Sequence, residues 1–397
     1  MIVIAAASGT SADGLDVGVV DVAFDDAGDL ELAVLDARTE AWQPALREAV
    51  LALLPPAATS AAEFCALDQA LGQATADAVS AVIDRIAPRS AELVVAPGQT
   101  VFHDVRDGAC HGTLQLGQPA WVAERTGLPV VSDLRARDVA AGGQGAPLVS
   151  ILDSLWLQGS PGPVAALNLG GIANVSIVGA AGTPVLAWDT GPANCLLDVA
   201  AAQVTQGQQT FDRDGKIARS GVVRPDLLDR LLSHPHFSRR PPVSTGRETF
   251  SGEYVDAALG SLPPVSAGDL LATLTELTAV SVAQAIAPYD IREVVASGGG
   301  TRNAALMAAL GRCLAATPLV TSDERGLPAR AKEVVMWALL GFLTWHGLPA
   351  TTGATGAVGP RVLGRISPGL GPLRLPSPAS RPVRRLRVVS PVVGRPS

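Results

Sequence analysis

Three glycine-bearing loops in the chain are suited to close contact between the backbone and phosphate groups. They are SGTSADGLD at residues 8–16, NLGGIAN at 168–174 and SGGGTRN at 297–303. Small residues in such turns let backbone N–H groups approach a polyphosphate, and Asp13 could also orient a metal ion. None of the loops has the GxGxxG spacing of a dinucleotide fold or the lysine of a P-loop. Because glycine, serine and aspartate also form ordinary turns, the loops indicate a nucleotide site only in combination.

Carboxylates near these loops could carry proton transfer. Asp189, in WDTGPAN, ends an apolar segment and precedes a Gly-Pro turn. A strand-end aspartate at that point can take a proton from water or a hydroxyl during phosphoryl transfer. A structural role, capping the turn or the next helix, is the alternative. Glu248 and Glu333 are further carboxylates, for which a surface pair with Arg247 and a helix-face charge are the structural alternatives.

Apolar patterning places the loops between regular elements. Alternating or continuous apolar runs predict strands, and apolar residues at helical spacing predict helices. Residues 61–86 form the longest such helix, with Leu67 and Leu71 on its apolar face. The expected strands lie in 2–7, 16–24, 30–37, 92–100, 164–178, 185–194 and 292–300, and further helices in 269–287, from about 303 and in 334–345.

The arrangement around residue 163 repeats that of the first residues. Each half opens with a strand, a glycine-bearing turn and a second strand, which indicates a duplicated architecture with two phosphate loops facing each other. Strands interleaved with helices indicate the α/β class.

Composition excludes several kinds of protein. A net charge of −7 disfavours a general nucleic-acid binder. The longest apolar run, Val334 to Trp345, is too short to cross a bilayer. The cysteines are widely separated in sequence, so we expect no zinc site and no disulfide framework. We expect all four to be reduced thiols. They are Cys65, Cys110, Cys195 and Cys313.

A chain of 397 residues is expected to form two domains. Domain I is expected at 1–145, with 350–366 as a stretch that can return to it, and domain II at 146–349. Residues 367–397 are rich in Pro, Ser and Arg without acidic residues, which predicts a disordered tail, with anion or partner binding as the alternative. The first residues lack a basic leader, which favours a cytoplasmic protein.

An ordered series of motifs resembles the anhydro-N-acetylmuramic acid kinase family. The resemblance covers about residues 2–368, and the order of the series makes it specific. The motifs are SGTSADGLD, GQTVFH, TLQLGQPAWVAERTGLPVVSDLRARDVAAGGQGAPLV, NLGGIAN, WDTGPAN, FDRDGKIA, STGRETF, TLTELTA, SGGGTRN and TGATGAVGPRVLG.

The resemblance implies a fold and a reaction. The fold is the duplicated ribonuclease-H-like fold of the actin, Hsp70 and hexokinase superfamily, with two domains and an interdomain ATP cleft. The reaction opens the 1,6-anhydro ring of 1,6-anhydro-N-acetylmuramic acid with water and phosphorylates O6. Its products are N-acetylmuramic acid 6-phosphate and ADP. ATP and Mg2+ are the implied cofactors, the amino sugar is the partner, and a homodimer is one option.

Site residues follow from the resemblance together with the loops. The catalytic residue is expected to be Asp189 and the metal ligand Asp13. ATP is expected to contact Gly9, Thr10, Ser11, Ala12, Asp13, Gly14, Leu15, Asp16, Gly170, Gly171, Asn174, Gly298, Gly299, Gly300 and Asn303. The sugar, which carries a lactyl carboxylate, is expected to contact Arg135, Arg137, Gln144, Gly145, Asn194 and Glu333.

The roles of the two arginines and the function both have alternatives. Either arginine in DLRARD can instead form an ion pair with Asp133 or Asp138. The chain departs from the family pattern at Pro97, Ala193 and Val243, where His, Gly and Lys are usual. These departures leave a nucleotide-binding protein without turnover as one competing function. A related kinase acting on an ordinary sugar hydroxyl is the other, and a dehydrogenase is a distant third because its glycine fingerprint is missing.

Overall fold

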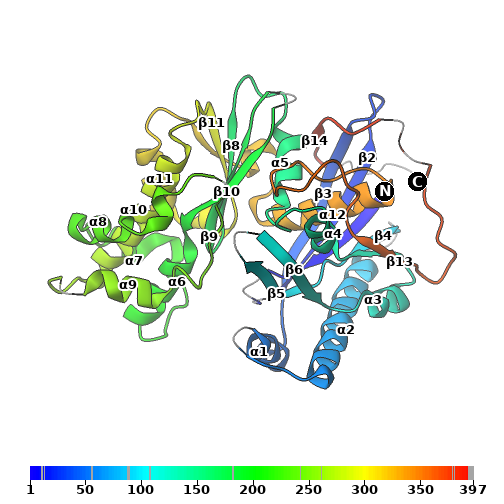
Figure 1. Cartoon of the computed structure of the whole chain (residues 1–397), viewed down its shortest axis with the longest axis horizontal. Helices are drawn as coiled ribbons and strands as arrows, with labels where there is room; N and C mark the ends of the chain where they lie inside the picture. The colour runs from blue at the N-terminus through cyan, green and yellow to red at the C-terminus, as the bar shows by residue number, and fades with distance from the viewer. Residues whose placement is uncertain are drawn as a thin grey trace. The chain divides into compact units, whose positions relative to one another are not determined.

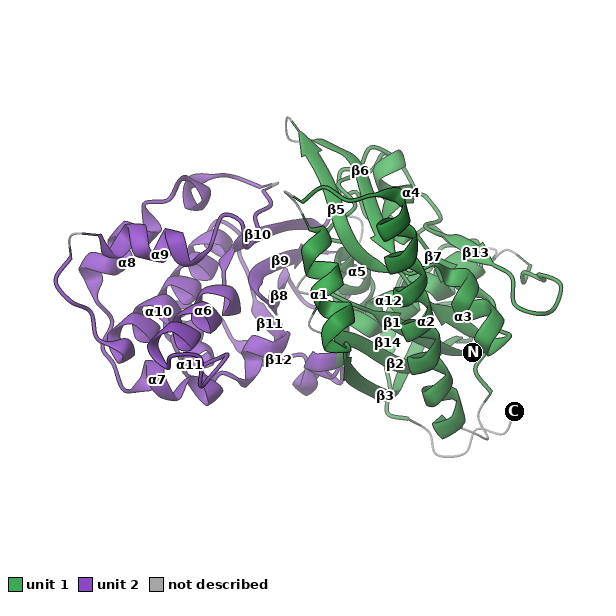
Figure 2. Ribbon diagram, turned by 90° about the horizontal axis from the view of Figure 1, so that it is seen from below, with its two compact units in different colours: residues 1–157, 331–397 green, residues 158–330 purple. Residues whose placement is uncertain are grey.

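The structure is a computed structural model of the 397-residue chain. It describes residues 1–9, 12, 14–54, 57–86, 90–106, 109–180, 183–241, 243–260, 262–377, 379 and 381–391. The chain forms two compact units (Figure 2): unit 1 contains residues 1–157 and 331–397, and unit 2 contains residues 158–330. The division therefore differs from the expected boundaries at 145 and 349.

Unit 1 contains a seven-stranded sheet in the order β13-β7-β4-β1-β2-β3-β14, and a separate β5-β6 hairpin (Figure 1). Its strands are β1 (Ile2–Ala7), β2 (Gly14–Phe24), β3 (Leu30–Ala41), β4 (Leu93–Val95), β5 (Gln99–Arg106), β6 (Ala109–Leu116), β7 (Val130–Ser132), β13 (Arg365–Ser367) and β14 (Leu386–Val388). Its helices are α1 (Pro44–Leu53), α2 (Ala61–Ile86), α3 (Pro119–Thr126), α4 (Leu134–Ala140), α5 (Val149–Leu157) and α12 (Lys332–Trp345).

Helices cover both faces of this sheet. Ile4 of β1 packs in one core with residues of α2 such as Leu71. Side chains alternate between the two faces of a strand, so Gly18, flanked in β2 by members of that core, faces the other side. There Val334 of α12 occupies the space that a Gly18 side chain would need. This close packing of α12 on the sheet is why residues 331–345 belong to unit 1.

Unit 2 contains a five-stranded sheet in the order β10-β9-β8-β11-β12. Its strands are β8 (Val164–Leu169), β9 (Ile172–Val178), β10 (Leu186–Pro192), β11 (Glu293–Ser297) and β12 (Leu319–Thr321). Its α-helices are α6 (Asn194–Val204), α7 (Lys216–Arg219), α8 (Pro225–Leu232), α9 (Gly252–Leu259), α10 (Ala267–Ile286) and α11 (Ala304–Cys313), and its 3-10 turns are η1 (Arg213–Gly215), η2 (Pro235–Ser238), η3 (Gly299–Arg302), η4 (Asp323–Arg325) and η5 (Ala329–Ala331).

The two sheets share one topology. In unit 1, β2 is antiparallel to β1 and β3, while β4 is parallel to β1 and β7 is parallel to β4. In unit 2, β9 is antiparallel to β8 and β10, while β11 is parallel to β8 and β12 is parallel to β11. The expected α/β fold, duplicated and ribonuclease-H-like, is confirmed.

Helix α10 is long and apolar enough to span a membrane by length and composition, but 67% of its most apolar 18-residue stretch is buried inside the protein. Val282 packs on the sheet of unit 2, and Leu274 packs against α6, α8 and α9. This double burial accounts for its apolar composition.

The segment after residue 367 differs from the expected disordered tail. Within its described part, β14 pairs in parallel with β3, and the backbone N–H of Leu30 donates to the Arg385 carbonyl at 2.9 Å. Leu386 is only 3% exposed, and Arg387 pairs with Glu31 at 2.7 Å. A segment with few apolar residues cannot form its own core, but the open edge of β3 supplies hydrogen-bond partners for its backbone.

Candidate active site

Asp189 lies on β10, the edge strand of the unit 2 sheet, directly before a β-bulge. It is in register with Asn174 of β9, and the pairing shifts between Asp189 and Gly191. Gly191 has a φ of 143°, and Phe237 occupies the space that a side chain would need there. The bulge re-aims the backbone directly after Asp189, as bulges beside functional sites commonly do.

One oxygen of the Asp189 carboxylate is held by a neighbouring loop. Oδ2 accepts hydrogen bonds from Ser244 Oγ and from the Thr245 backbone N–H, both at 2.9 Å. The Asp189 N–H donates to the Val243 carbonyl at 3.0 Å. No described residue donates a hydrogen bond to Oδ1, and Asp189 does not cap α6, whose N-cap is Ala193. The carboxylate is therefore fixed through one oxygen and has the other free to accept a proton.

The surroundings of Asp189 favour its protonated form. Burial raises the pKa of the Asp189 carboxyl, the bonds from Thr245 and Ser244 lower it, and nearby Glu248 raises it. A base with a raised pKa is a stronger proton acceptor near neutral pH.

His236 supports the strand behind this carboxylate. Its ring hydrogen bonds to backbone of β10 at Asp189 and Thr190, and the residue is 6% exposed. Burial lowers the pKa of the His236 imidazole, so the ring is neutral at pH 7. Sequence patterns did not predict this contact, because His236 lies 47 residues beyond Asp189.

The expected phosphate turn of unit 2 is tied to the start of α6. The N–H groups of residues 193, 194 and 195 donate to the carbonyls of Gly170 and Gly171 at 3.0 Å. Asn194 Nδ2 donates to the carbonyls of Leu169 and Gly170 at 3.0 and 2.8 Å. The Nδ2 group of Asn194 therefore holds the turn, and the expected contact of this residue with the sugar stays a prediction.

The third glycine loop packs against the same turn. A side chain on Gly298 or Gly300 would collide with residues 168–169, whereas a Cβ on Gly299 would meet no atom within 4 Å. Asn303 Oδ1 accepts hydrogen bonds from the N–H groups of Ala305 and Leu306 and so caps α11. Gly299 is the glycine whose backbone a ligand can approach.

The first loop, in unit 1, is partly described. Thr10, Ser11 and Asp13 lie outside the described residues. Ala12 has a φ of 50° and its N–H donates to the Gly9 carbonyl at 3.1 Å. A Cβ on Gly14 would lie 2.6 Å from the Glu40 carbonyl, and the Leu15 side chain is in the core. Of residues 14–16, only Asp16 has a side chain suited to contact a ligand.

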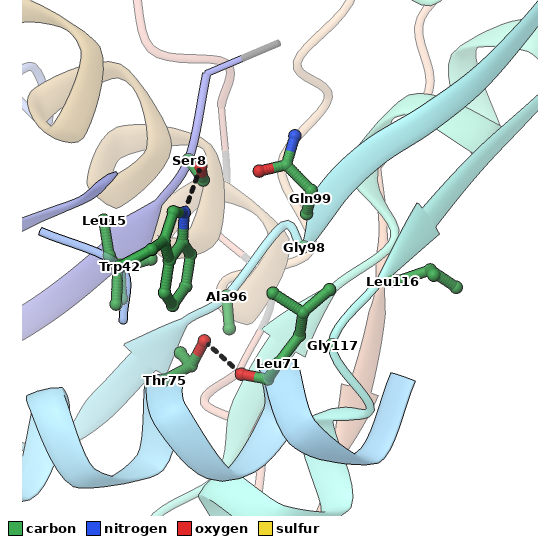
Figure 3. A pocket seen from close by; sticks show the side chains of 11 residues that line it. Ser8, Leu15, Trp42, Leu71, Thr75, Ala96, Gly98, Gln99, Leu116 and Gly117 are labelled. Carbon is green, nitrogen blue, oxygen red and sulfur yellow. Dashed lines mark hydrogen bonds between the residues drawn. The ribbon is translucent and has the colours of Figure 1, made fainter. Parts of the chain in front are cut away.

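Buried side chains hold the start of that loop (Figure 3). Trp42 Nε1 donates to Ser8 Oγ at 3.2 Å, as Figure 3 shows. Gln99 Nε2 donates to the Gly9 carbonyl at 3.0 Å. A cavity beside them, also lined by Thr75, has about 10 Å³ open to a water-sized sphere. That volume has room for about one water molecule, so this cavity does not bind a sugar or nucleotide. Gln99 Oε1 is buried here without a hydrogen-bond partner among the described residues.

Two expected sugar-binding residues lie in one electrostatic cluster of unit 1. Arg135 of α4 interacts with Glu333 of α12, and its guanidinium lies 5.1 Å from the centre of the Trp337 ring. Burial and nearby Asp16 raise the pKa of the Glu333 carboxyl, although part of the residue remains open to solvent. Burial also raises the pKa of Asp16, opposed by a 2.5 Å hydrogen bond from Thr39 Oγ1.

The AGGQGAP segment is organised by a residue that the sequence did not single out as functional. Asp138 is fully buried, and its oxygens accept hydrogen bonds from the Gly145 N–H and from Thr355 Oγ1, both at 2.8 Å. Arg135 donates to the Gly145 carbonyl at 2.8 Å. His103 lies against Gly145, where its pKa is lowered by burial and by Arg135.

The ion pairs proposed as alternatives for the two arginines do not form in the described structure. Asp133 pairs with Arg365 at 3.7 Å, and Asp138 interacts with Arg135 without a direct ion pair. Arg137 is exposed, and the Gln144 N–H donates to the Thr355 carbonyl at 2.8 Å. Arg135, Gly145 and Glu333 are thus brought together, with Gln144 adjacent.

Comparison with known proteins gives one consistent family. A sequence model described as "Anhydro-N-acetylmuramic acid kinase" matches residues 1–369. The protein of that name from Streptomyces coelicolor is 49% identical over 98% of this chain and 99% of that protein, and the one from Streptomyces avermitilis is 50% identical over 97% and 99%. Among solved structures, component A of the (R)-2-hydroxyglutaryl-CoA dehydratase from Acidaminococcus fermentans is 13% identical with a TM-score of 0.42, covering 86% of this chain and 98% of that one. A TM-score below 0.5 carries no inference about function.

Proposed function

The chain belongs to the anhydro-N-acetylmuramic acid kinase family, and we propose that it opens the 1,6-anhydro ring of 1,6-anhydro-N-acetylmuramic acid with water and transfers the γ-phosphoryl group of ATP to O6. The products are N-acetylmuramic acid 6-phosphate and ADP. The observation that carries this proposal is the Asp189 carboxylate, held through Oδ2 and free to accept a proton at Oδ1.

Asp189 starts the proposed reaction. The substrate has no free hydroxyl at C6, so water must first open the ring. Asp189 accepts a proton from that water molecule as the water oxygen bonds to C1. The C1–O6 bond breaks and its electron pair goes to O6. O6 then bonds to the γ-phosphorus while the bond between that phosphorus and the bridging oxygen of ADP breaks. A positioned general base contributes about 10²- to 10⁴-fold in rate.

The remaining candidate residues divide between the sugar and the nucleotide. Arg135 is the proposed partner of the lactyl carboxylate, since a guanidinium forms two parallel hydrogen bonds with a carboxylate. Glu333 orients Arg135 and accepts a hydrogen bond from the one free hydroxyl of the sugar, on C4. The ATP phosphates are assigned to the loops at 9–16, 170–174 and 298–300.

Mg2+ is the proposed metal. The described residues contain no group of three or more His, Cys, Asp or Glu side chains that could hold a metal ion by themselves. Kinase sites bind Mg2+ with one or two carboxylates plus phosphate oxygens, and the Asp16 carboxylate is a hard-oxygen donor of that kind. Together with Asp13 it would hold the ion, which would offset the negative charge of the phosphates.

All four cysteines are free thiols, in keeping with a reducing compartment. We therefore assign the enzyme to the cytoplasm, where ATP is available. A homodimer remains an option that light scattering on the purified chain would decide.

The test is ADP release by the purified full chain. With ATP and Mg2+, 1,6-anhydro-N-acetylmuramic acid should give one ADP and one sugar 6-phosphate per turnover. N-acetylmuramic acid, which has a free O6, is the matched control. Activity on the control alone would replace the proposed reaction by ordinary hydroxyl phosphorylation. ATP binding without turnover on either sugar would leave only a nucleotide-binding protein.

A further inference from the structure

Arg247 lies against the glycine turn of unit 2 without an acidic partner. Its Nε and Nη2 atoms lie 3.2 Å from the position that a Cβ on Gly171 would take. The glycine at 171 therefore lets the guanidinium lie directly against the turn, where a Cβ would press on it. Within the described residues Arg247 forms no ion pair and no hydrogen bond, and it is exposed to solvent.

The neighbouring carboxylate does not neutralise this cation. The sequence left open a surface pair between Arg247 and Glu248, but no such ion pair forms. Both carboxylate oxygens of Glu248 instead lie against Gly246, in the space that a side chain there would fill. An arginine beside a glutamate that is turned away from it has donors available for another anion.

The loop that carries Arg247 is anchored on both sides. On one side, Ser244 Oγ and the Thr245 N–H bind Asp189 Oδ2. On the other side, the N–H groups of Thr249 and Phe250 donate to the Gly246 carbonyl at 3.1 Å, and Phe250 is 1% exposed in the core. The entropy cost of ordering the backbone that carries Arg247 is therefore met by folding rather than by ligand binding.

The guanidinium lies near the start of α6. Arg247 acts electrostatically on Cys195, opposing the burial that raises the pKa of that thiol, which places the guanidinium near the start of α6. The N-terminus of an eleven-residue helix adds partial positive charge at the same place. An unpaired guanidinium, a glycine turn and a helix start together favour an anionic ligand group.

We propose that Arg247 binds the phosphoryl group that is transferred and stabilises the charge on its oxygens in the transition state. The inference rests on the proposed function and deepens it. As O6 bonds to the γ-phosphorus, the electron pair of the breaking bond moves to the bridging oxygen of ADP, and the three equatorial oxygens keep their negative charge. A guanidinium offers them two N–H donors in a fixed plane, whereas a lysine offers a point charge.

The test compares Arg247→Ala and Arg247→Lys with wild type and with Arg312→Ala. Arg312 is an exposed arginine of the same unit that pairs with Glu276 at 2.8 Å, so it controls for loss of a surface charge. We expect kcat to fall at least 100-fold in Arg247→Ala and less in Arg247→Lys, with the Kd of ATP changing less than tenfold. Added guanidinium chloride should restore part of the alanine variant's activity. Arg312→Ala should match wild type.

Three results would overturn the proposal. The first is an Arg247→Ala variant with kcat within threefold of wild type. The second is an unchanged kcat with a KM for the sugar raised tenfold or more, which would assign Arg247 to the lactyl carboxylate. The third is a wild-type chain that releases no ADP, which would remove the proposed function as well. The first two, in an active wild type, reject the role of Arg247 alone. Circular dichroism and the melting temperature confirm folding of each variant.

Discussion

Asp189→Asn separates the chemistry of the proposed base from its structural contacts. In the variant, the amide oxygen can keep the position of Oδ2 and still accept the hydrogen bonds of Ser244 and Thr245. The amide nitrogen then replaces the free oxygen, Oδ1, and cannot accept a proton. Loss of a general base predicts a fall in kcat of about 10²- to 10⁴-fold, or roughly 2.7–5.4 kcal/mol of transition-state stabilisation.

The stability of the Asp189→Asn variant should stay the same or rise, although its activity falls. Burial is the largest cause of the raised pKa of Asp189, so the ionised carboxylate is destabilised in the folded state. A group with a raised folded pKa stabilises the fold below its unfolded pKa and loses that contribution as pH rises through the folded pKa. Asparagine carries no such charge at pH 7, so Asp189→Asn should melt at or above the wild-type temperature.

Measurements of kcat by ADP release, ATP affinity by calorimetry and the melting temperature together test the reasoning. The nearest other carboxylate that acts on Asp189 is Glu248, so Glu248→Gln is the matched control and should lose far less activity. If Asp189→Asn kept more than a tenth of wild-type kcat, Asp189 would not be the base. If it lost activity together with ATP affinity and folding, its role would be structural.

Two more predictions concern charge. The pH at which kcat/KM falls on the acid side should lie above the ordinary pKa of an aspartate. Ser244→Ala removes a hydrogen bond that lowers the pKa of Asp189, so it should move this fall to still higher pH. A shift to lower pH would contradict this. Lys332 and Asp153 form a 2.7 Å ion pair at 6% and 1% side-chain exposure. Lys332→Met should cost about 3–5 kcal/mol in urea unfolding by leaving a buried charge, and adding Asp153→Leu should recover most of it; no recovery in the double variant would argue against a charge effect.

Elements with strong local patterns were predicted well from the sequence. Residues 61–86 form α2 within the expected bounds, and the expected helix at 269–287 is α10 at 267–286, because apolar residues repeat with the helical period in both. The glycine loops were also found between the expected elements, since turn chemistry is local. The duplicated topology followed from these local patterns and the repeat.

Contacts between distant residues were not predictable in this way. Asp138 and Thr355 are 217 positions apart, and Asp138 organises the segment beside Arg135 only because residues 351–359 return to unit 1. The anchoring of Asp189 by Ser244 likewise depends on a loop 55 residues later in the chain. The sequence shows that these residues are polar but does not show which of them bond to each other.

The strand β14 has a consequence for any shortened form of the protein. The family match stops at residue 369, so trimming the chain to that region would discard residues 386–388 and uncover the outer margin of β3. A bare strand margin presents unpaired N–H and C=O groups to other molecules and promotes self-association. Residues 386–388 thus shield a sheet whose chemistry-bearing loop lies more than 360 positions earlier.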